Sequence, residues 1–344
     1  IVELYSKDTI QPFLLYRVTH SLISNLEIDS FIKAFDKLVE TKFINIFTLL
    51  VGLMIVMSFS EKEVILKLIK RSREISPDTL YVQGTLTSFE LIYYWIGNDI
   101  KNAVTIYNKY RNYLLQQSNF TELSKAGFIF YSYIGFLIAY REKNIIYYEK
   151  KDSNYKNLYI FGESHSLAQN NIIYLLDNNL FLCKSLFIMG CKMHHIAKPD
   201  SSYMSLSIKN YLNTIEDNSN IMFTIGEIDT RPDEGIWQVH LKKEKNLDEI
   251  INNTVGGYID FLYENLKDKN LSSVTIQGIP APNYELKDDK DPKDDIGFLS
   301  MIKKVNEKLK ELTLEKGWNF LDVYGATVGE DLKSNKKWHI DSHH

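Results

Sequence analysis

Hydrophobic residues in the first 150 positions recur at spacings of three and four, which is the period of one face of an α-helix. Polar, glycine or proline breaks such as Ser76–Asp78 and Gly97–Asp99 interrupt this pattern at short intervals. Short helices between close breaks indicate helical hairpins, so we predict an all-α domain over residues 1–150. The expected helices are Ser30–Thr41, Phe43–Phe59, Lys62–Ile75, Thr87–Ile96, Asp99–Gln117, Phe120–Gly135 and Phe136–Lys143.

The pattern changes after the charged segment Arg141–Lys156, where short apolar runs begin to alternate with amphipathic helices. Alternation of this kind is typical of an α/β fold. We therefore expect residues 151–344 to form a flavodoxin-like parallel sheet with helices on both faces. The predicted strands are Leu158–Phe161, Leu182–Met189, Ile221–Ile225, Val274–Ile279 and Phe320–Val323. The predicted helices are Ser166–Leu176, Ser205–Ile215, Leu247–Lys267 and Ile296–Lys316.

Charge and cysteine content narrow the classes of function. The chain has 344 residues, a formal net charge of −4 and a pI of about 6.1. This weakly acidic balance argues against the broad phosphate-neutralising surface of a nucleic-acid-binding protein. The two cysteines, Cys183 and Cys191, cannot form a disulfide framework, which favours a reducing, cytoplasmic location. A single disulfide between them is left open.

The most apolar stretch, Phe43–Phe59, is at the lower limit of length for a membrane span. Charged residues flank it closely on both sides, and the neighbouring predicted helices are themselves apolar and aromatic. We therefore predict a buried helix rather than a transmembrane one, and no association with a membrane. The chain begins at Ile1 without a basic and apolar leader, so no secretory signal is expected.

Candidate catalytic residues lie just after the apolar runs, because ligands of open α/β sheets bind at the carboxyl ends of the strands. Gly162 and Ser164 follow the first run, and glycine permits a tight turn there. Backbone N–H groups at the start of a helix can hold the oxyanion that forms when a serine attacks an ester. The alternative is that Ser164 only caps the helix.

The loop after the second run contains Gly190, which can donate a backbone N–H into the same crevice. The alternative is a glycine that only ends the strand. His194 and His195 follow, but no Cys, His or carboxylate stands nearby at the spacing of metal ligands. We therefore predict no metal and no cofactor.

The loop after the third run contains Glu227, Asp229 and Arg231. An arginine between carboxylates can bind an anionic group of a substrate. It can equally form a buried ion pair, with either Asp229 or Glu227, that holds the loop. The sequence leaves both roles open, and all three residues are candidate substrate-binding residues.

The C-terminal segment carries the fourth candidate. Asp341 and His344 are three residues apart, which in a turn lets the carboxylate face the imidazole and orient it as a general base. His339 and His343 are rival bases that lack this spacing from a carboxylate. The alternative is that the final two histidines are the remnant of a purification tag.

The order of these four segments resembles the block order of the SGNH/GDSL hydrolases, over roughly residues 157–344. Gly162-Glu163-Ser164 is similar to the first block, where Asp usually replaces the glutamate. Gly190 is similar to the glycine of the second block, Gly226–Asp229 to the Gly-x-Asn-Asp of the third, and Asp341 with His344 to the last. The resemblance implies a triad of Ser164, His344 and Asp341, with the backbone N–H groups of Ser164 and Gly190 as the oxyanion hole.

Ile228 departs from this resemblance, because it stands where the family has an asparagine that donates to the oxyanion. Loss of one such donor costs about a hundred- to a thousand-fold in turnover, unless Arg231, His194 or His195 replaces it. Our first hypothesis is a serine esterase or O-acyltransferase acting on an acylated carbohydrate or a similar ester. The second is a glycan-binding or scaffolding protein with a degenerate hydrolase domain. A third adds a protein partner for the helical half, since Gly97–Tyr107 looks like part of a tetratricopeptide-type repeat.

Overall fold

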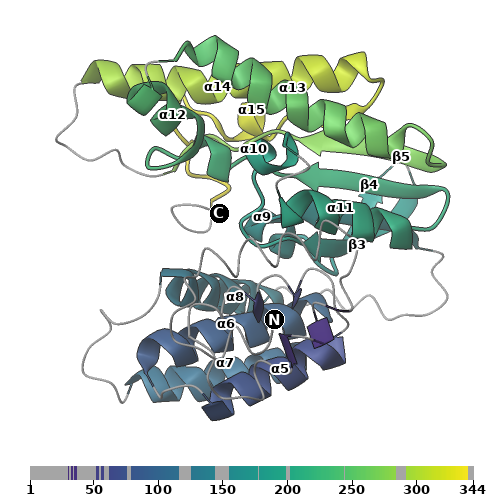
Figure 1. Cartoon of the computed structure of the whole chain (residues 1–344), viewed down its shortest axis with the longest axis vertical. Helices are drawn as coiled ribbons and strands as arrows, with labels where there is room; N and C mark the ends of the chain where they lie inside the picture. The colour runs from purple at the N-terminus through teal and green to yellow at the C-terminus, as the bar shows by residue number, and fades with distance from the viewer. Residues whose placement is uncertain are drawn as a thin grey trace. The chain divides into compact units, whose positions relative to one another are not determined.

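The chain forms two compact units, Ile1–Ser153 and Asn154–His344 (Figure 1). A helical region precedes an α/β region with a mostly parallel sheet, which confirms the predicted fold class at that level. The computed structural model describes residues 30, 32–33, 35–36, 52–53, 56–57, 62–75, 79–115, 125–143, 155–176, 178–198, 202–243, 245–283 and 292–339.

The first unit is helical, and α6 is the helix that contacts its three neighbours. Leu86, Leu91 and Ile92 of α6 are fully buried, so the hydrophobic effect holds these helices together. A tight turn joins α6 to α7, and Asn98 there adopts a left-handed φ of 56°. The described helices are α5 (Lys62–Ile75), α6 (Leu80–Ile96), α7 (Ile100–Leu115) and α8 (Lys125–Lys143).

Two helix boundaries differ from the predicted ones. Helix α6 begins at Leu80 rather than at Thr87, because Thr79 caps it by accepting a hydrogen bond from the Val82 N–H at 3.4 Å. Helix α8 is continuous where the sequence predicted a break after Gly135. A Cβ at this glycine would lie 2.5 Å from the ring of Tyr107, so Gly135 marks close helix packing rather than a helix end.

The apolar stretch Phe43–Phe59 lies mostly outside the described residues. Of its described members, Leu53 and Val56 are fully buried, and Gly52 lies against the ring of Phe35. In the described part of the chain, none of the helices combines the length and the hydrophobicity that a membrane crossing requires.

The second unit is built on a six-stranded sheet with the order β2-β3-β1-β4-β5-β6. Strand β2 pairs antiparallel with β3, and the other pairs are parallel. The central strand β4 is buried along its whole length, and Phe161 of β1 stacks on Phe223 of β4 with ring centroids 4.7 Å apart. The strands are β1 (Lys156–Gly162), β2 (Ile173–Leu176), β3 (Asn179–Phe187), β4 (Ser219–Thr224), β5 (Leu271–Gln277) and β6 (Asn319–Leu321).

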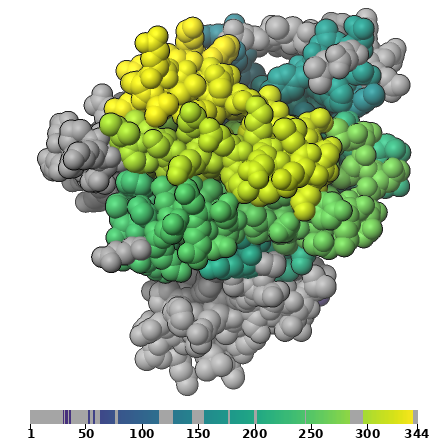
Figure 2. All heavy atoms as spheres, turned by 90° about the horizontal axis from the view of Figure 1, so that it is seen from above, coloured from purple at the N-terminus to yellow at the C-terminus, as the bar shows by residue number. Residues whose placement is uncertain are grey.

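Helices alternate with these strands and pack against the sheet and each other. In Figure 2 the helices from α12 to α14, coloured green to yellow-green, cover one face of this unit. The helices are α9 (Ser164–Ala168), α10 (Met193–Ile196), α11 (Tyr203–Thr214), α12 (Gly235–Lys243), α13 (Leu247–Leu266), α14 (Pro292–Glu315) and α15 (Val323–Thr327), with a 3₁₀ turn η3 at Ile228–Thr230.

The predicted helix Ser166–Leu176 is wrong. Helix α9 ends at Ala168, and the chain turns into the edge strand β2, which pairs with β3. Asn171 and Asn178 stand on either side of β2 with left-handed φ angles of 57° and 61°. Asparagine tolerates this conformation better than most residues. The two asparagines therefore form turns that are incompatible with a continuous helix.

Candidate functional site

The candidate residues after β1, β3 and β4 gather at one edge of the sheet, because these strands are parallel and their carboxyl ends meet there. The Ile188 N–H donates to the Gly162 carbonyl at 2.9 Å and ties the ends of β3 and β1 together. A Cβ on Gly162 would overlap with Oγ1 of Thr224, at the end of β4. Gly162 is therefore required by the close packing of β1 against β4.

Glu163, not Ser164, is the N-cap of α9, and Ser164 is the first residue of the helix. This answers the alternative raised by the sequence, that Ser164 is only the cap. The Ser164 hydroxyl instead donates a hydrogen bond of 2.6 Å to Oε2 of Glu163. The other oxygen of Glu163, Oε1, lies 2.6 Å from Nδ1 of His165. One buried carboxylate thus links a hydroxyl and an imidazole that are consecutive in the chain.

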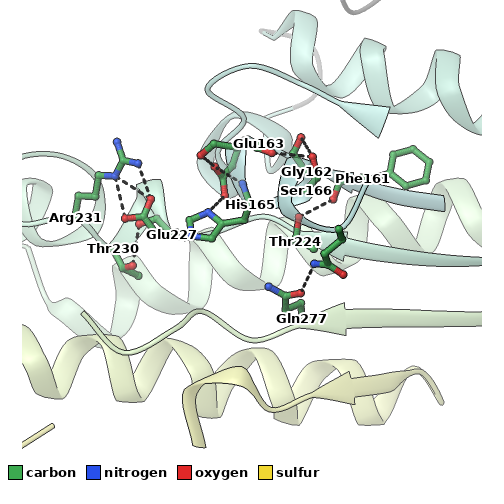
Figure 3. A network of polar contacts seen from close by, with 12 residues as sticks. Phe161, Gly162, Glu163, His165, Ser166, Thr224, Glu227, Thr230, Arg231 and Gln277 are labelled. Carbon is green, nitrogen blue, oxygen red and sulfur yellow. Dashed lines mark hydrogen bonds and ion pairs between the residues drawn. The ribbon is translucent and has the colours of Figure 1, made fainter. Parts of the chain in front are cut away.

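His165 carries a positive charge near neutral pH. Burial by itself disfavours the imidazolium, but the charge and the hydrogen bond of Glu163 outweigh it and raise the pKa of His165 to about 9. Glu227 adds to this rise, while Arg231 opposes it. Figure 3 shows the imidazole lying between Glu163 and the Glu227–Arg231 pair, which connects the loop after β1 with the loop after β4.

Arg231 is paired with Glu227, which selects one of the two partners expected from the sequence. Its Nε lies 3.0 Å and 2.9 Å from the two carboxylate oxygens, and Nη2 lies 2.7 Å from Oε2. Nη1 reaches Glu234 at 3.4 Å, and Glu234 in turn binds Lys192 at 2.5 Å. This pairing outweighs burial and holds the pKa of Arg231 above its usual value. The guanidinium is therefore largely occupied within the protein.

Asp229 binds backbone groups. Its two oxygens accept the N–H of Met193 at 2.7 Å and the N–H of His194 at 3.1 Å, both at the start of α10. Burial raises the pKa of Asp229 to about 7, although these two hydrogen bonds and Lys192 favour the charged form. Asp229 therefore fastens the loop after β4 to the loop after β3.

The loop after β3 begins with Gly190, which has a left-handed φ of 66°. A Cβ would have open space around it, so glycine is present here for its backbone conformation rather than for room. Within the described residues, the Gly190 N–H has no hydrogen-bond acceptor. This leaves a backbone donor at the edge where the oxyanion hole was predicted.

The two histidines of this loop are not placed to hold a charge. Burial first and the neighbouring lysines second lower the pKa of His195 to about 4, and they lower the pKa of His194 as well. The His195 ring contacts the sulfur of Met204 at 3.2 Å. Across the described ranges, no three His, Cys, Asp or Glu side chains come together as a metal site. Cys183 and Cys191 are both buried and free.

Ile228 is 7% exposed and lies in the 3₁₀ turn η3. Its side chain has no hydrogen-bond donor, so this position cannot supply a donor to an oxyanion.

Asp341, His343 and His344 lie outside the described residues, so the structure does not test the proposed triad. The segment that leads to them is held at the same edge of the sheet. The Thr327 hydroxyl accepts the Ala281 N–H at 2.9 Å, and the Ser334 N–H donates to the Pro282 carbonyl at 2.9 Å, in the loop after β5. His339, the last described residue, lies 2.7 Å from the Ser334 hydroxyl through Nδ1.

The sequence reasoning missed Glu163 and His165 as members of the site. Their signal was their position, because both are ionisable and flank Ser164 directly at the end of β1. No protein-family model matches the chain, and no curated protein resembles it significantly.

Proposed function

We propose that the second unit is a serine esterase or O-acyltransferase of the SGNH/GDSL kind on a flavodoxin-like fold. With the edge strand β2 set aside, the order β3-β1-β4-β5-β6 corresponds to the doubly wound order 2-1-3-4-5. The observation that carries the proposal is the hydrogen bond of 2.6 Å from the Ser164 hydroxyl to buried Glu163, at the carboxyl end of β1. A buried serine in this place, whose hydroxyl is held by a carboxylate, is suited to nucleophilic attack once a general base takes its proton.

In the proposed reaction, Ser164 Oγ attacks the carbonyl carbon of an ester while His344, oriented by Asp341, takes the hydroxyl proton. The backbone N–H groups of Ser164 and Gly190 bind the oxyanion. The C–O bond to the alcohol then breaks, and His344 returns the proton to the leaving oxygen. Water or a sugar hydroxyl attacks the acyl-enzyme in the same way, which releases the acyl group and restores Ser164.

Glu163 and His165 are positioning residues in this scheme. Glu163 fixes the rotamer of the Ser164 hydroxyl before the substrate binds. His165, whose pKa is about 9, is an imidazolium at neutral pH and neutralises the buried carboxylate. A positive charge adjacent to the nucleophile also favours the negative charge that develops on the substrate, which compensates in part for Ile228.

The pairing of Arg231 bears on the substrate. Because Glu227 and Glu234 occupy the guanidinium, an anionic substrate would have to compete with two carboxylates. This favours a neutral ester, and an O-acylated carbohydrate fits that chemistry. Glu227 and Arg231 then shape the site, while an oxygen of Glu227 remains a candidate acceptor for a sugar hydroxyl.

The decisive experiment is labelling with a fluorophosphonate, together with hydrolysis of p-nitrophenyl acetate. We expect labelling of the unmodified protein and none in Ser164→Ala, with hydrolysis reduced by about a thousand-fold or more. Ser272→Ala, at an exposed serine of β5, is the matched control and should behave as the unmodified protein. His344→Ala and Asp341→Ala test the triad separately. Equal hydrolysis in Ser164→Ala and the unmodified protein would end the proposal.

The second candidate is a glycan-binding or scaffolding protein, and Ile228 is the observation that favours it. A site that binds without turnover needs no full set of oxyanion donors. This candidate predicts no labelling of any variant, and binding of an acetylated oligosaccharide that Ser164→Ala leaves unchanged.

A further inference from the structure

Helices α5, α6 and α7 of the first unit line an open cavity of about 650 Å³. This size is typical of ligand sites in proteins. Leu66 and Ile69 of α5 and Ile106 of α7 contribute its apolar lining, and Ile69 is almost fully buried. The cavity belongs to the helical unit alone and does not depend on the chemistry proposed for Ser164.

Tyr110 lines this cavity, and its hydroxyl is buried and unsatisfied. Tyr110 is 5% exposed, and its oxygen has no hydrogen-bond partner within the described residues. Its ring is held by Tyr113, at 5.7 Å between centroids, and by the edge of Tyr131 at 5.3 Å. Burial raises the pKa of Tyr110 to about 12, so the group is a neutral donor. A buried donor without an acceptor is costly, and a ligand in the cavity would satisfy it.

The charges around the cavity differ in availability. Arg73 is occupied, because it donates to Gln83, Thr87 and Glu90 at 2.8 to 3.0 Å. Lys70 of α5 and Lys109 of α7 also line the cavity, but they are exposed and make no ion pair with any described residue. Two positive charges without a carboxylate partner among the described residues therefore lie on two different helices, beside the apolar lining formed by Leu66, Ile69 and Ile106 (the apolar floor).

We propose that this cavity binds an acidic peptide segment, with carboxylates on Lys70 and Lys109, an apolar side chain on the floor and an acceptor on the Tyr110 hydroxyl. A compact anion such as phosphate has no apolar part and would leave the apolar lining in water. A segment that alternates acidic and apolar residues matches both features, since its charges and its apolar side chains are spread over a comparable length.

The test is fluorescence anisotropy on the full chain, with a short fluorescein-labelled peptide that alternates aspartate and leucine. The expected result is saturable binding, which the double variant Lys70→Glu/Lys109→Glu weakens by about tenfold or more. Tyr110→Phe keeps the ring and should weaken binding by about threefold to tenfold, with the helical content unchanged by circular dichroism. A peptide with asparagine in place of aspartate should bind at least about tenfold more weakly.

The matched control is Lys101→Glu/Lys143→Glu, which makes the same change in charge on the same unit but at residues that do not line the cavity. Equal weakening by this control would overturn the proposal, because it would reduce the binding to general attraction. Unchanged affinity in Tyr110→Phe would also overturn it, since the peptide would then lie outside the cavity. Inorganic phosphate and glucuronic acid serve as competitors, and binding of either one without binding of the peptide would exclude a peptide site.

Discussion

Two loops at the same edge of the sheet each bury a carboxylate to 1% exposure, yet the two carboxylates bind different kinds of group. Glu163, after β1, binds the hydroxyl of Ser164 and the imidazole of His165. Asp229, after β4, binds the backbone N–H groups of Met193 and His194. Backbone donors fix a loop and have no chemistry of their own, whereas a hydroxyl and an imidazole can exchange protons. We therefore infer that Asp229 holds the loops in place, whereas Glu163 positions the groups that carry out the proposed reaction.

The charges around the two carboxylates support the same distinction. The charge of Glu163 is balanced by a neighbouring imidazolium, so this loop carries a proton that can respond to pH. Asp229 has no such partner among its contacts, and burial raises its pKa to about 7 instead. Because the loops differ in this way, we expect substitution of Asp229 to act mainly on stability and substitution of Glu163 to lower the catalytic rate as well.

The largest expected effect is on stability, in Asp229→Ala. Removing the carboxylate leaves the Met193 and His194 N–H groups without an acceptor, and we expect a loss of about 4 kcal/mol in the free energy of unfolding. Asp229→Asn keeps one acceptor oxygen and should lose about half as much. Urea denaturation measures both. Full stability of Asp229→Ala combined with lost activity would reverse the assignment and make Asp229 a residue of the site.

The next effect is a pH dependence of stability that belongs to His165. Because its pKa is about 9 in the folded chain against 6.5 for a free imidazole, its contribution is complete below pH 6.5 and is lost as the pH rises through 9. Each pKa unit corresponds to about 1.4 kcal/mol, so the loss amounts to about 3 kcal/mol. His165→Gln should remove this part of the pH profile of urea unfolding. The same slope in His165→Gln as in the unmodified protein would show that other groups cause it.

The third prediction concerns catalysis through Glu163. Glu163→Gln keeps the shape of the side chain but removes its negative charge. The Ser164 hydroxyl is then held less firmly, and the His165 imidazolium loses its carboxylate partner. We expect kcat for p-nitrophenyl acetate to fall by about a hundred-fold, and the free energy of unfolding at neutral pH to fall by about 3 kcal/mol, because Glu163 is the cause of the raised pKa of His165. The pH profile of activity should also shift, since the pKa of His165 falls when its partner is neutral.

Glu234→Gln is the control for this variant, because Glu234 binds Lys192 and Arg231 but neither Ser164 nor His165. It should retain activity within about threefold. If Glu163→Gln is as active as Glu234→Gln, then Glu163 serves only as the cap of α9, and the two loops do not differ in role.

The sequence predicted the five parallel strands because each contains a short apolar run, and in the central strand β4 this run is buried along its whole length. It missed β2, whose Ile173–Leu176 shows no alternation and leaves Leu175 70% exposed at the edge of the sheet. Its helical interpretation failed because the turns depend on the backbone of Asn171 and Asn178, and a residue type only permits such a conformation without enforcing it.

For the site, the position of Ser164 followed from one rule, that functional residues come after parallel strands. The partners of Asp229 could not be predicted, because they lie 35 and 36 residues away in the chain and are backbone groups that look alike in every sequence. The choice of Glu227 over Asp229 as partner of Arg231 has the same origin. Once Asp229 accepts two N–H groups, Glu227 is the one of the two expected carboxylates that remains for Arg231.

The smallest expected effect is on stability, and it depends on which atoms pack against a glycine in each loop. At Gly162 an added Cβ would meet the Thr224 side chain, whereas at Gly235 it would meet the backbone oxygen of Asp229 at a left-handed φ of 74°. Gly162→Ala should therefore cost about 2 kcal/mol in urea unfolding, and much of that cost should disappear when Thr224→Ala is added. Gly256→Ala, in open space on α13, is the control and should stabilise by about 0.5 to 1 kcal/mol.

Gly235→Ala should resist rescue by any side-chain change, because only a backbone shift relieves it. If Thr224→Ala leaves the cost of Gly162→Ala unchanged, the loop after β1 is fixed by its backbone in the same way as the loop after β4.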